Sequence, residues 1–349
     1  MKSYRVAIVG TGRMAGSIDD EVLQYPACTL PYSHAAAYAT IPATTVVAAA
    51  DINEAQLSKF CHRWNVPNPY KDYREMIERE KPDILSITTP GTSHAEICIF
   101  AANHAVKGIY CEKAMACSME ECDRMVEAVE RNGVKFNLGT LRRWAVGSDV
   151  IKDLLHRGEL GKLQAIVTYG VGSLLHSASH YFDLVLFFAD DADVDWVQGT
   201  VFAKPEEVIR SRVERDVGGH GVIQFKNGLR AYALETGLVA EFEVIGSAGT
   251  ARSMNNGIDY QLRKTTAMDG GKWKRVGIVP FPTFERRSPT VRCIEDLLQA
   301  VETSGNTRGN VRVARAGTEI AFGLLSSHQQ SGARVPFPLK DRSLYMVSK

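Results

Sequence analysis

A glycine-rich turn directly after the first strand-like run constrains the fold of this chain more than any other feature. The apolar run 5–9 is followed by a segment that fits the pattern G-x-G-x-x-A, namely Gly10, Thr11, Gly12, Arg13, Met14 and Ala15. In a strand–turn–helix unit the first glycine permits a tight turn and the second lets backbone approach a pyrophosphate. The small third residue allows the helix to pack closely on the strand, and the helix start offers N–H groups to the phosphates. The pattern predicts a dinucleotide-binding turn, although such glycines can also serve the turn's conformation alone.

Alternating strand-like and helical patterns follow this turn. Short apolar runs, as expected for strands buried on both faces of a parallel sheet, lie at 45–50, 83–88 and 108–111. Helical patterns separate them at 54–64, 71–80, 92–104 and 118–132. The segment between the turn and the second strand is longer than a simple crossover needs, so we expect an insertion ahead of a short helix at 34–39. This alternation predicts βαβ units in a Rossmann domain.

The second strand-like run ends in an acidic residue, Asp51. A carboxylate there accepts hydrogen bonds from the ribose hydroxyls of NAD and repels the 2′-phosphate of NADP. Asp51 lies further from the glycine-rich turn than the usual ~20 residues, because the expected insertion lengthens the segment between them. The next residues, Ile52 and Asn53, offer no cation for a phosphate, so the sequence favours NAD as the cofactor. The alternative is a solvated aspartate that caps the helix beginning at 54.

The pattern changes after about residue 160. Strand candidates follow one another at 163–170, 194–203, 219–225, 229–235 and 240–246, some joined by turn residues such as those at 226–228. Helical stretches lie at 177–189, 289–303 and 311–331. We therefore expect an α/β Rossmann domain (1–125) followed by an α+β domain with a largely antiparallel open sheet (126–349).

Composition is that of an ordinary globular enzyme and excludes several classes. The chain has 349 residues, 45% hydrophobic and 23% charged, with a net charge of +1, which gives no general attraction to nucleic acid or an anionic membrane. No apolar run reaches the roughly 18 residues of a membrane span. Because a strand-like run begins at residue 5, we expect no signal peptide, and seven cysteines without a C-x-x-C suggest neither disulfides nor a metal site. We expect a cytoplasmic protein.

Several short motifs occur in one order along the chain. They are Thr89-Pro90-x-x-x-His94, Glu112-Lys113-Ala114, Asn137, Arg142-Arg143, His176-x-x-x-His180-x-x-Asp183, the strand 242–250 and the closing segment 334–339. In this order they resemble the Gfo/Idh/MocA family of sugar and inositol dehydrogenases, and the resemblance spans nearly the whole chain. Each motif is weak by itself, but their order makes the resemblance specific.

The resemblance implies that a hydride passes between a sugar carbon and the nicotinamide of NAD. It places Thr89, Pro90, His94 and Glu112 at the cofactor. Lys113 then hydrogen-bonds the reacting hydroxyl and assists proton removal. An independent argument is that a lysine at the carboxyl end of a parallel strand lies at the ligand crevice, where the positive nicotinamide disfavours its ammonium form. The alternative is a surface lysine paired with the preceding glutamate.

Three polar residues share a face of an otherwise apolar helical segment. Spacings of four and three residues bring together His176, His180 and Asp183. The resemblance identifies His180 as the catalytic histidine, oriented by Asp183, which accepts the substrate proton as the hydride leaves. We also expect His176 to take part in catalysis and both histidines to bind substrate. A histidine on a helix is more often a packed or capping residue, but three polar groups on one apolar helix need a cavity or partners.

Two positions depart from the family pattern. His176 stands where inositol-dehydrogenase-like members carry aspartate, which changes the charge at the substrate hydroxyls. Ala114 replaces the proline whose preceding bond is typically cis in the family. A cis bond before a residue other than proline costs about 2.5–4 kcal/mol. We therefore expect the backbone at Lys113 to differ from that of the family and to move Lys113 slightly.

The segment after the strand-like run 134–138 offers further substrate contacts. Arg142 and Arg143 can bind substrate hydroxyls or an acidic group, and Trp144 can stack on the face of a sugar. The alternative is that the two arginines are only charged residues at the start of a helix. The loop 211–218, with Arg212 and Arg215, is expected to face solvent.

Three functions fit these patterns. The first is an NAD-dependent dehydrogenase acting on a secondary alcohol of a sugar, sugar acid or cyclitol. The second is an NAD-dependent enzyme that cleaves glycosides through transient oxidation at C3, and the third is a non-catalytic sensor of NAD or sugar, against which the retained Lys113, His180 and Asp183 argue. The resemblance also implies a homodimer or homotetramer formed through the open sheet.

Overall fold

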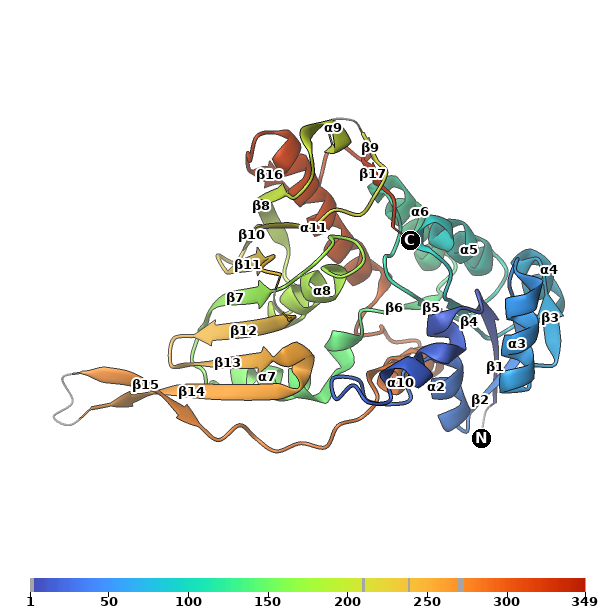
Figure 1. The fold of residues 1–349 in the computed structure, drawn as a ribbon, viewed down its shortest axis with the longest axis horizontal. Coiled ribbons are helices and arrows are strands. Elements are labelled where there is room, and N and C mark those ends of the chain that lie inside the picture. The colour runs from blue at the N-terminus through green and yellow to red at the C-terminus, as the bar shows by residue number, and fades with distance from the viewer. Residues whose placement is uncertain (1–2, 209–210, 238, 269–272, 349) are drawn as a thin grey trace. The chain divides into compact units, whose positions relative to one another are not determined.

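The chain folds into two compact units (Figure 1). The computed structural model describes residues 3–208, 211–237, 239–268 and 273–348. The first unit comprises Met1–Trp144, Arg287–Thr318 and Tyr345–Lys349, and the second comprises Ala145–Arg286 and Glu319–Leu344. Each unit therefore contains segments from distant parts of the sequence, and each is described by itself.

These bounds differ from the expected division at residue 125. Strand β6 (Lys135–Leu138) pairs in parallel with β5 and belongs to the first sheet. Helix α10 (Pro289–Thr303) also belongs to the first unit, because Cys293, Ile294 and Leu297 pack in its hydrophobic core. The chain leaves the first unit only after Trp144 and returns to it at Arg287.

The first unit contains a six-stranded parallel sheet with the order β3-β2-β1-β4-β5-β6. Its other strands are β1 (Tyr4–Val9), β2 (Thr44–Ala50), β3 (Asn68–Tyr70), β4 (Ile84–Ile87) and β5 (Gly108–Cys111). This is the strand order of a dinucleotide-binding fold, whose order reverses between β1 and β4. Side chains of β4 and β5 are buried throughout, as expected for strands covered on both faces.

The helices of the first unit follow the expected pattern closely. They are the π-turn η1 (Arg13–Ser17), α1 (Ile18–Val22), α2 (His34–Thr40), α3 (Glu54–Trp64), α4 (Tyr73–Glu80), α5 (Gly91–Asn103), α6 (Met119–Arg131) and the 3-10 turn η2 (Leu141–Trp144). The expected insertion carries α1 and α2. Caps explain some bounds: the Asn53 side chain accepts a hydrogen bond from the Gln56 N–H at the start of α3, and Ser118 caps α6 through the Glu121 N–H.

The second unit is built on a nine-stranded sheet with the order β15-β14-β13-β12-β7-β11-β10-β8-β16. The strands are β7 (Leu163–Tyr169), β8 (Val194–Val201), β10 (Gly219–Phe225), β11 (Arg230–Leu234), β12 (Glu241–Gly246), β13 (Gly249–Met254), β14 (Asp259–Ala267), β15 (Lys274–Val279) and β16 (Val335–Pro336). Only β7 and β11 pair in parallel among its described ladders. The sheet is therefore largely antiparallel, as expected.

The remaining elements lie in or between these units along the chain. They are α7 (Val146–His156), α8 (Ser179–Phe188), α9 (Pro205–Val208), β9 (Arg212–Val213), η3 (Asn255–Gly257), α11 (Val311–Gln329) and β17 (Tyr345–Met346). The division between units falls within α11, after Thr318. In the described part of the chain, no helix has the length and apolar character to cross a membrane. The seven cysteines are free thiols.

Candidate active site

The glycine-rich turn has the geometry that a close backbone approach requires. Gly10 has φ +83°, and a Cβ there would lie 2.9 Å from the backbone of Thr88. A Cβ on Gly12 would meet only the end of the Gln56 side chain, at 3.3 Å, so the space above this residue is open. Ala15 is fully buried beneath the turn. These are the conditions under which a diphosphate can lie against the main chain.

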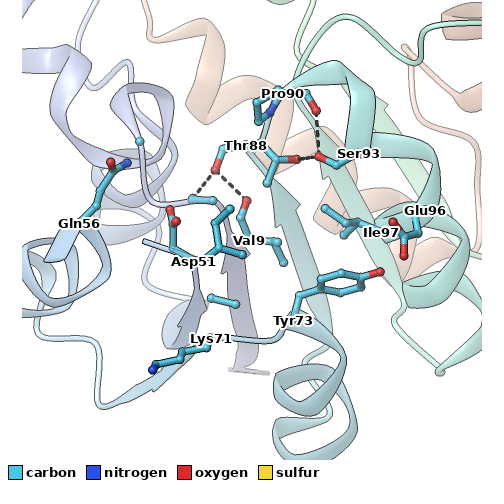
Figure 2. Close-up of a pocket in the computed structure, with 15 residues that line it drawn as sticks. Val9, Asp51, Gln56, Lys71, Tyr73, Thr88, Pro90, Ser93, Glu96 and Ile97 are labelled. Carbon is cyan, nitrogen blue, oxygen red and sulfur yellow. Dashed lines mark hydrogen bonds between the residues drawn. The ribbon is translucent and has the colours of Figure 1, made fainter. Parts of the chain in front are cut away.

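A pocket of about 360 Å³ opens over this turn, at the carboxyl ends of β1, β2 and β4 (Figure 2). It lies at the reversal of strand order, where open α/β sheets bind ligands. Its lining residues are Val9, Gly10, Gly12, Ala50, Asp51, Ile52, Gln56, Lys71, Tyr73, Thr88, Thr89, Pro90, Ser93, Glu96 and Ile97. The donor and acceptor groups here fit a nucleotide: open glycine backbone beside a carboxylate.

Asp51 is held in this pocket by the turn itself. Its Oδ2 accepts hydrogen bonds from the Thr11 backbone N–H (2.7 Å) and the Thr11 hydroxyl (2.8 Å). Its Oδ1 accepts one from the Asn53 N–H at 2.8 Å. Helix α3 is capped by Asn53 and not by Asp51. The carboxylate is thus fixed at the pocket wall, with oxygen lone pairs left for hydroxyl donors.

The side chains of Arg13 and Met14 are not part of this lining as the described residues give it. Arg13 is exposed and forms an ion pair with Glu21 at 2.5 Å, and Met14 is half-buried. In this pocket, only the backbone at these two positions remains as a candidate for binding phosphates. Any contact of Arg13 and Met14 with the cofactor in this pocket would therefore come from their main-chain groups.

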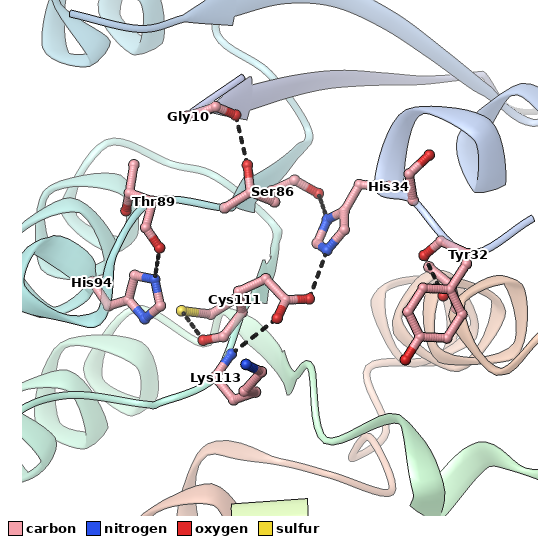
Figure 3. A network of polar contacts seen from close by, with 12 residues as sticks. Gly10, Tyr32, His34, Ser86, Thr89, His94, Cys111 and Lys113 are labelled. Carbon is pink, nitrogen blue, oxygen red and sulfur yellow. Dashed lines mark hydrogen bonds and ion pairs between the residues drawn. The ribbon is translucent and has the colours of Figure 1, made fainter. Parts of the chain in front are cut away.

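His94 joins the pocket to the segment that carries Lys113. The ring is fully buried, with Nε2 2.7 Å from the Thr89 carbonyl and Nδ1 2.6 Å from the Ala114 carbonyl (Figure 3). Burial lowers the pKa of His94, and the two carbonyl contacts only partly offset this. The expectation that His94 contacts the cofactor is therefore corrected. Both of its ring nitrogens contact backbone carbonyls, so His94 links the loop at Thr89 to the loop at Ala114.

The backbone at Lys113 keeps the form that the alanine was expected to change. The bond between Lys113 and Ala114 is cis, so that expectation was wrong. The Ala114 carbonyl is held by His94, and Ala114 itself is buried. Lys113 is half-buried, two residues beyond the end of β5.

Glu112 lies in the interior, although the sequence pattern placed it at the cofactor. Its side chain is only 5% exposed, and its Oε1 lies 3.1 Å from His34 Nε2. Burial by itself raises the pKa of Glu112. The hydrogen bond and charge of His34, together with the charges of Lys113 and His94, outweigh burial, and the pKa of Glu112 falls below its usual value. The expectation that Glu112 contacts the cofactor is therefore corrected, because its side chain is buried against His34 of α2.

Two of the three residues offered for substrate in the segment 142–144 belong to the core. Arg143 and Trp144 are each 1% exposed. The Arg143 guanidinium donates to the Arg308 carbonyl at 3.2 Å, and a Cβ on Gly309 would lie 2.5 Å from the Trp144 ring. Both expectations were wrong, since a side chain enclosed in this way presents no face to a sugar. Arg142 is half-buried and stays a candidate.

The second unit carries the histidine motif. His180 is half-buried and Asp183 is buried, one turn apart on α8. His176 precedes this helix and is exposed in a turn, so the three side chains do not share one helical face as expected. The reason is that α8 begins only at Ser179.

Asp216 is a residue at this motif that the sequence did not reveal. Its two carboxylate oxygens accept hydrogen bonds from the N–H groups of Leu175 (3.0 Å) and His176 (2.7 Å). Burial raises the pKa of Asp216, and these hydrogen bonds only partly counter it. The surrounding loop is exposed at Arg212 and Arg215, as expected. An isolated acid in a polar loop gives no sequence signal of this role.

This chain is similar to several known proteins. The model of an oxidoreductase family with an NAD-binding Rossmann fold, Gfo/Idh/MocA, matches residues 4–140. Residues 4–140 of this chain are thus similar to the NAD-binding Rossmann fold of that family. Inositol 2-dehydrogenase of Salmonella typhimurium is 29% identical over 133 residues, which are 38% of this chain and only 39% of that protein. Myo-inositol 2-dehydrogenase of Thermotoga maritima is 23% identical over 284 residues, 76% of this chain and 77% of the relative.

A solved structure extends the likeness to the whole fold. Levoglucosan dehydrogenase, in complex with NADH and levoglucosan, has a TM-score of 0.75 and 19% identity, and the match covers 97% of this chain and 100% of that one. This confirms the expected fold class, a Rossmann domain followed by an α+β domain.

Proposed function

We propose that this protein is an NAD-dependent dehydrogenase that oxidises a secondary alcohol of a sugar, sugar acid or cyclitol, or catalyses the reverse reduction. One observation carries the proposal. A single buried ring, His94, touches both the pocket loop at Thr89 and the Ala114 carbonyl next to Lys113. A nucleotide pocket and a lysine at adjacent strand ends are thereby held at one edge of the sheet.

Each part of the first unit has a separate task in this proposal. The open backbone at Gly10 and Gly12 holds the diphosphate, and Asp51 takes the ribose hydroxyls. Bound nicotinamide supplies the hydride acceptor. Lys113 hydrogen-bonds the reacting hydroxyl and helps remove its proton, because the ammonium donates hydrogen bonds and the neutral amine accepts a proton.

The second unit supplies the other candidates. We propose that His180, steadied by Asp183 on the same helix, takes up the substrate proton. His176 and Arg142 are proposed to contact substrate hydroxyls or an acidic group. These roles follow the family motif and are each testable by a single substitution.

The substrate class is supported by the relatives' names. The proteins similar to this chain are named inositol 2-dehydrogenase, myo-inositol 2-dehydrogenase and levoglucosan dehydrogenase. All three act on compounds with several hydroxyl groups on a ring. The test is a screen of sugars, sugar acids and cyclitols with NAD⁺, following NADH absorbance, beside a screen of nitrophenyl glycosides. NADH formation with a polyol supports the proposal, and release of nitrophenol without NADH contradicts it.

We also propose that the protein forms a homodimer or homotetramer through the sheet of the second unit. Its edge strand β15 exposes Val276 (44%) and Ile278 (73%), and Trp273 beside it is 66% exposed. Val276 and Ile278 lie on one face of the strand because they are two residues apart. Light scattering after size-exclusion chromatography should give an oligomer that Ile278→Lys weakens. A monomeric wild-type protein would refute this.

A further inference from the structure

His34 and Glu112 come from distant parts of the sequence and meet next to the backbone of Lys113. Helix α2 presents His34 and Tyr38 on one face, because they are four residues apart. Strand β5 and the residue beyond it present Tyr110 and Glu112 on one face, because they are two apart. The insertion that lengthens the first crossover thus provides the partner of the glutamate next to the lysine.

The contacts in this group leave His34 a single orientation. Nε2 lies 3.1 Å from Glu112 Oε1, and Nδ1 lies 3.0 Å from the Ser86 hydroxyl (Figure 3). The Tyr38 hydroxyl contacts the same Ser86 oxygen at 2.9 Å. The ring also stacks on Tyr110, with centroids 4.0 Å apart and planes inclined by 7°. The His34 side chain is 0% exposed.

Glu112 depends on this histidine for its charge. An ionised carboxylate in the interior needs hydrogen-bond donors, and leaving it without them favours the protonated form. One oxygen faces His34, and the other accepts the Lys113 backbone N–H at 3.3 Å. Among the influences that hold the pKa of Glu112 low, the hydrogen bond of His34 is the largest.

We propose that His34 is a positioning residue that keeps Glu112 ionised, and that the Glu112 carboxylate in turn sets the pH at which Lys113 loses its proton. A neighbouring negative charge stabilises an ammonium, so an ionised Glu112 moves that pH upward. The inference rests on the proposed function only in that Lys113 is taken to be the lysine that meets substrate.

The other titratable groups around Glu112 do not replace His34. His94 is fully buried, and its ring nitrogens face the carbonyls of Thr89 and Ala114. Burial raises the pKa of Tyr110 well above its usual value and that of Tyr32 to about 12, so both phenols stay neutral near pH 7. The positive charge of Lys113 adds to the hydrogen bond of His34 in lowering the pKa of Glu112.

The test measures Lys113 directly, without turnover. The full chain, with and without NAD⁺, is labelled briefly with trace acetic anhydride across a pH series, and mass spectrometry gives the rate at Lys113. Glu112→Gln should lower the pH of half-maximal labelling by about 1–3 pH units. His34→Leu should move it in the same direction, because the carboxylate loses its donor. His34→Gln, which retains a donor, should restore a value near that of the wild type.

A surface pair provides the matched control. His156 and Asp190 form a histidine–carboxylate contact at 3.2 Å, with both side chains more than half exposed. His156→Leu and Asp190→Asn should leave the labelling of Lys113 unchanged. Once a substrate is found, the acid limb of kcat/KM should shift with the labelling midpoint in each Glu112 and His34 variant.

Two results would overturn the inference. A wild-type labelling midpoint in Glu112→Gln would show that the carboxylate does not set the proton affinity of Lys113. A lower Tm in His34→Leu with an unmoved midpoint would show that His34 is structural only. If the midpoints shift but Lys113→Met stays active, the inference stands while the proposed function fails.

Discussion

Removal of the charge at Asp51 should weaken the binding of NAD⁺ and strengthen the binding of NADP⁺. The carboxylate is fixed by three hydrogen bonds of 2.7–2.8 Å from Thr11 and Asn53, so its position does not depend on the ligand. A hydrogen bond to a charged group contributes about 1.5–3 kcal/mol. Two negative charges ~5 Å apart repel by ~3 kcal/mol at an effective dielectric constant of ~20.

These magnitudes set the expected change in affinity. Asp51→Asn keeps the size and one acceptor, so the Kd for NAD⁺ should rise about tenfold for ~1.4 kcal/mol lost. The Kd for NADP⁺ should fall by about tenfold, because solvent screens part of the repulsion. The preference for NAD⁺ therefore narrows roughly 100-fold. Isothermal titration of both nucleotides measures it.

Thr11→Val provides the control for this experiment. It removes the hydroxyl that donates to Asp51 and leaves the carboxylate charged, so the preference for NAD⁺ should persist even if both affinities fall. Tighter binding of NADP⁺ than of NAD⁺ by the wild-type protein would refute the reasoning. A ratio in Asp51→Asn that equals that of the wild type would refute it equally.

Three further predictions follow from the two units. Lys113→Met should lower kcat by about 10²-fold or more, the usual contribution of a positioned acid–base group, with NAD⁺ affinity nearly intact; Lys226→Met at the surface is the control, and near-normal turnover in Lys113→Met refutes the role. In steady-state kinetics His180→Ala should lose mainly kcat, whereas His176→Ala should mainly raise KM; small and equal effects would make both packing residues. Trp144→Ala should lower the free energy of unfolding by about 3–5 kcal/mol, measured by denaturant titration, and Trp144→Phe should lower it much less. A change in KM without a loss of stability would instead indicate that Trp144 contacts the substrate.

Features with local causes were predictable from the sequence. The turn at Gly10 and Gly12, the strands around it and helices 54–64 and 289–303 follow from apolar periodicity, glycine geometry and caps. The fold class followed from their alternation. The type of the second domain needed nothing beyond these local patterns and general rules of connection, whereas the order of the strands in each sheet came only from the structure.

Features that depend on distant contacts were not predictable. Glu112 was expected at the cofactor because its neighbours in the motif are, but its partner His34 lies 78 residues earlier. Trp144 and Arg143 follow a strand end that usually carries site residues, yet residues 308–309, far along the chain, enclose them. The unit boundary shifted for the same reason, since helix α10 returns to the first core from beyond residue 287.

Transfer of a hydrogen from a substrate carbon to the cofactor tests the central claim most directly. A polyol found in the screen is prepared with deuterium on the carbon that reacts, and is mixed with excess protein and NAD⁺ for a single turnover. The account predicts one deuterium at nicotinamide C4, detected by mass spectrometry of the cofactor, and transfer at least about 10²-fold slower with Lys113→Met. Conversion of the polyol by wild-type protein with an unlabelled cofactor would contradict it.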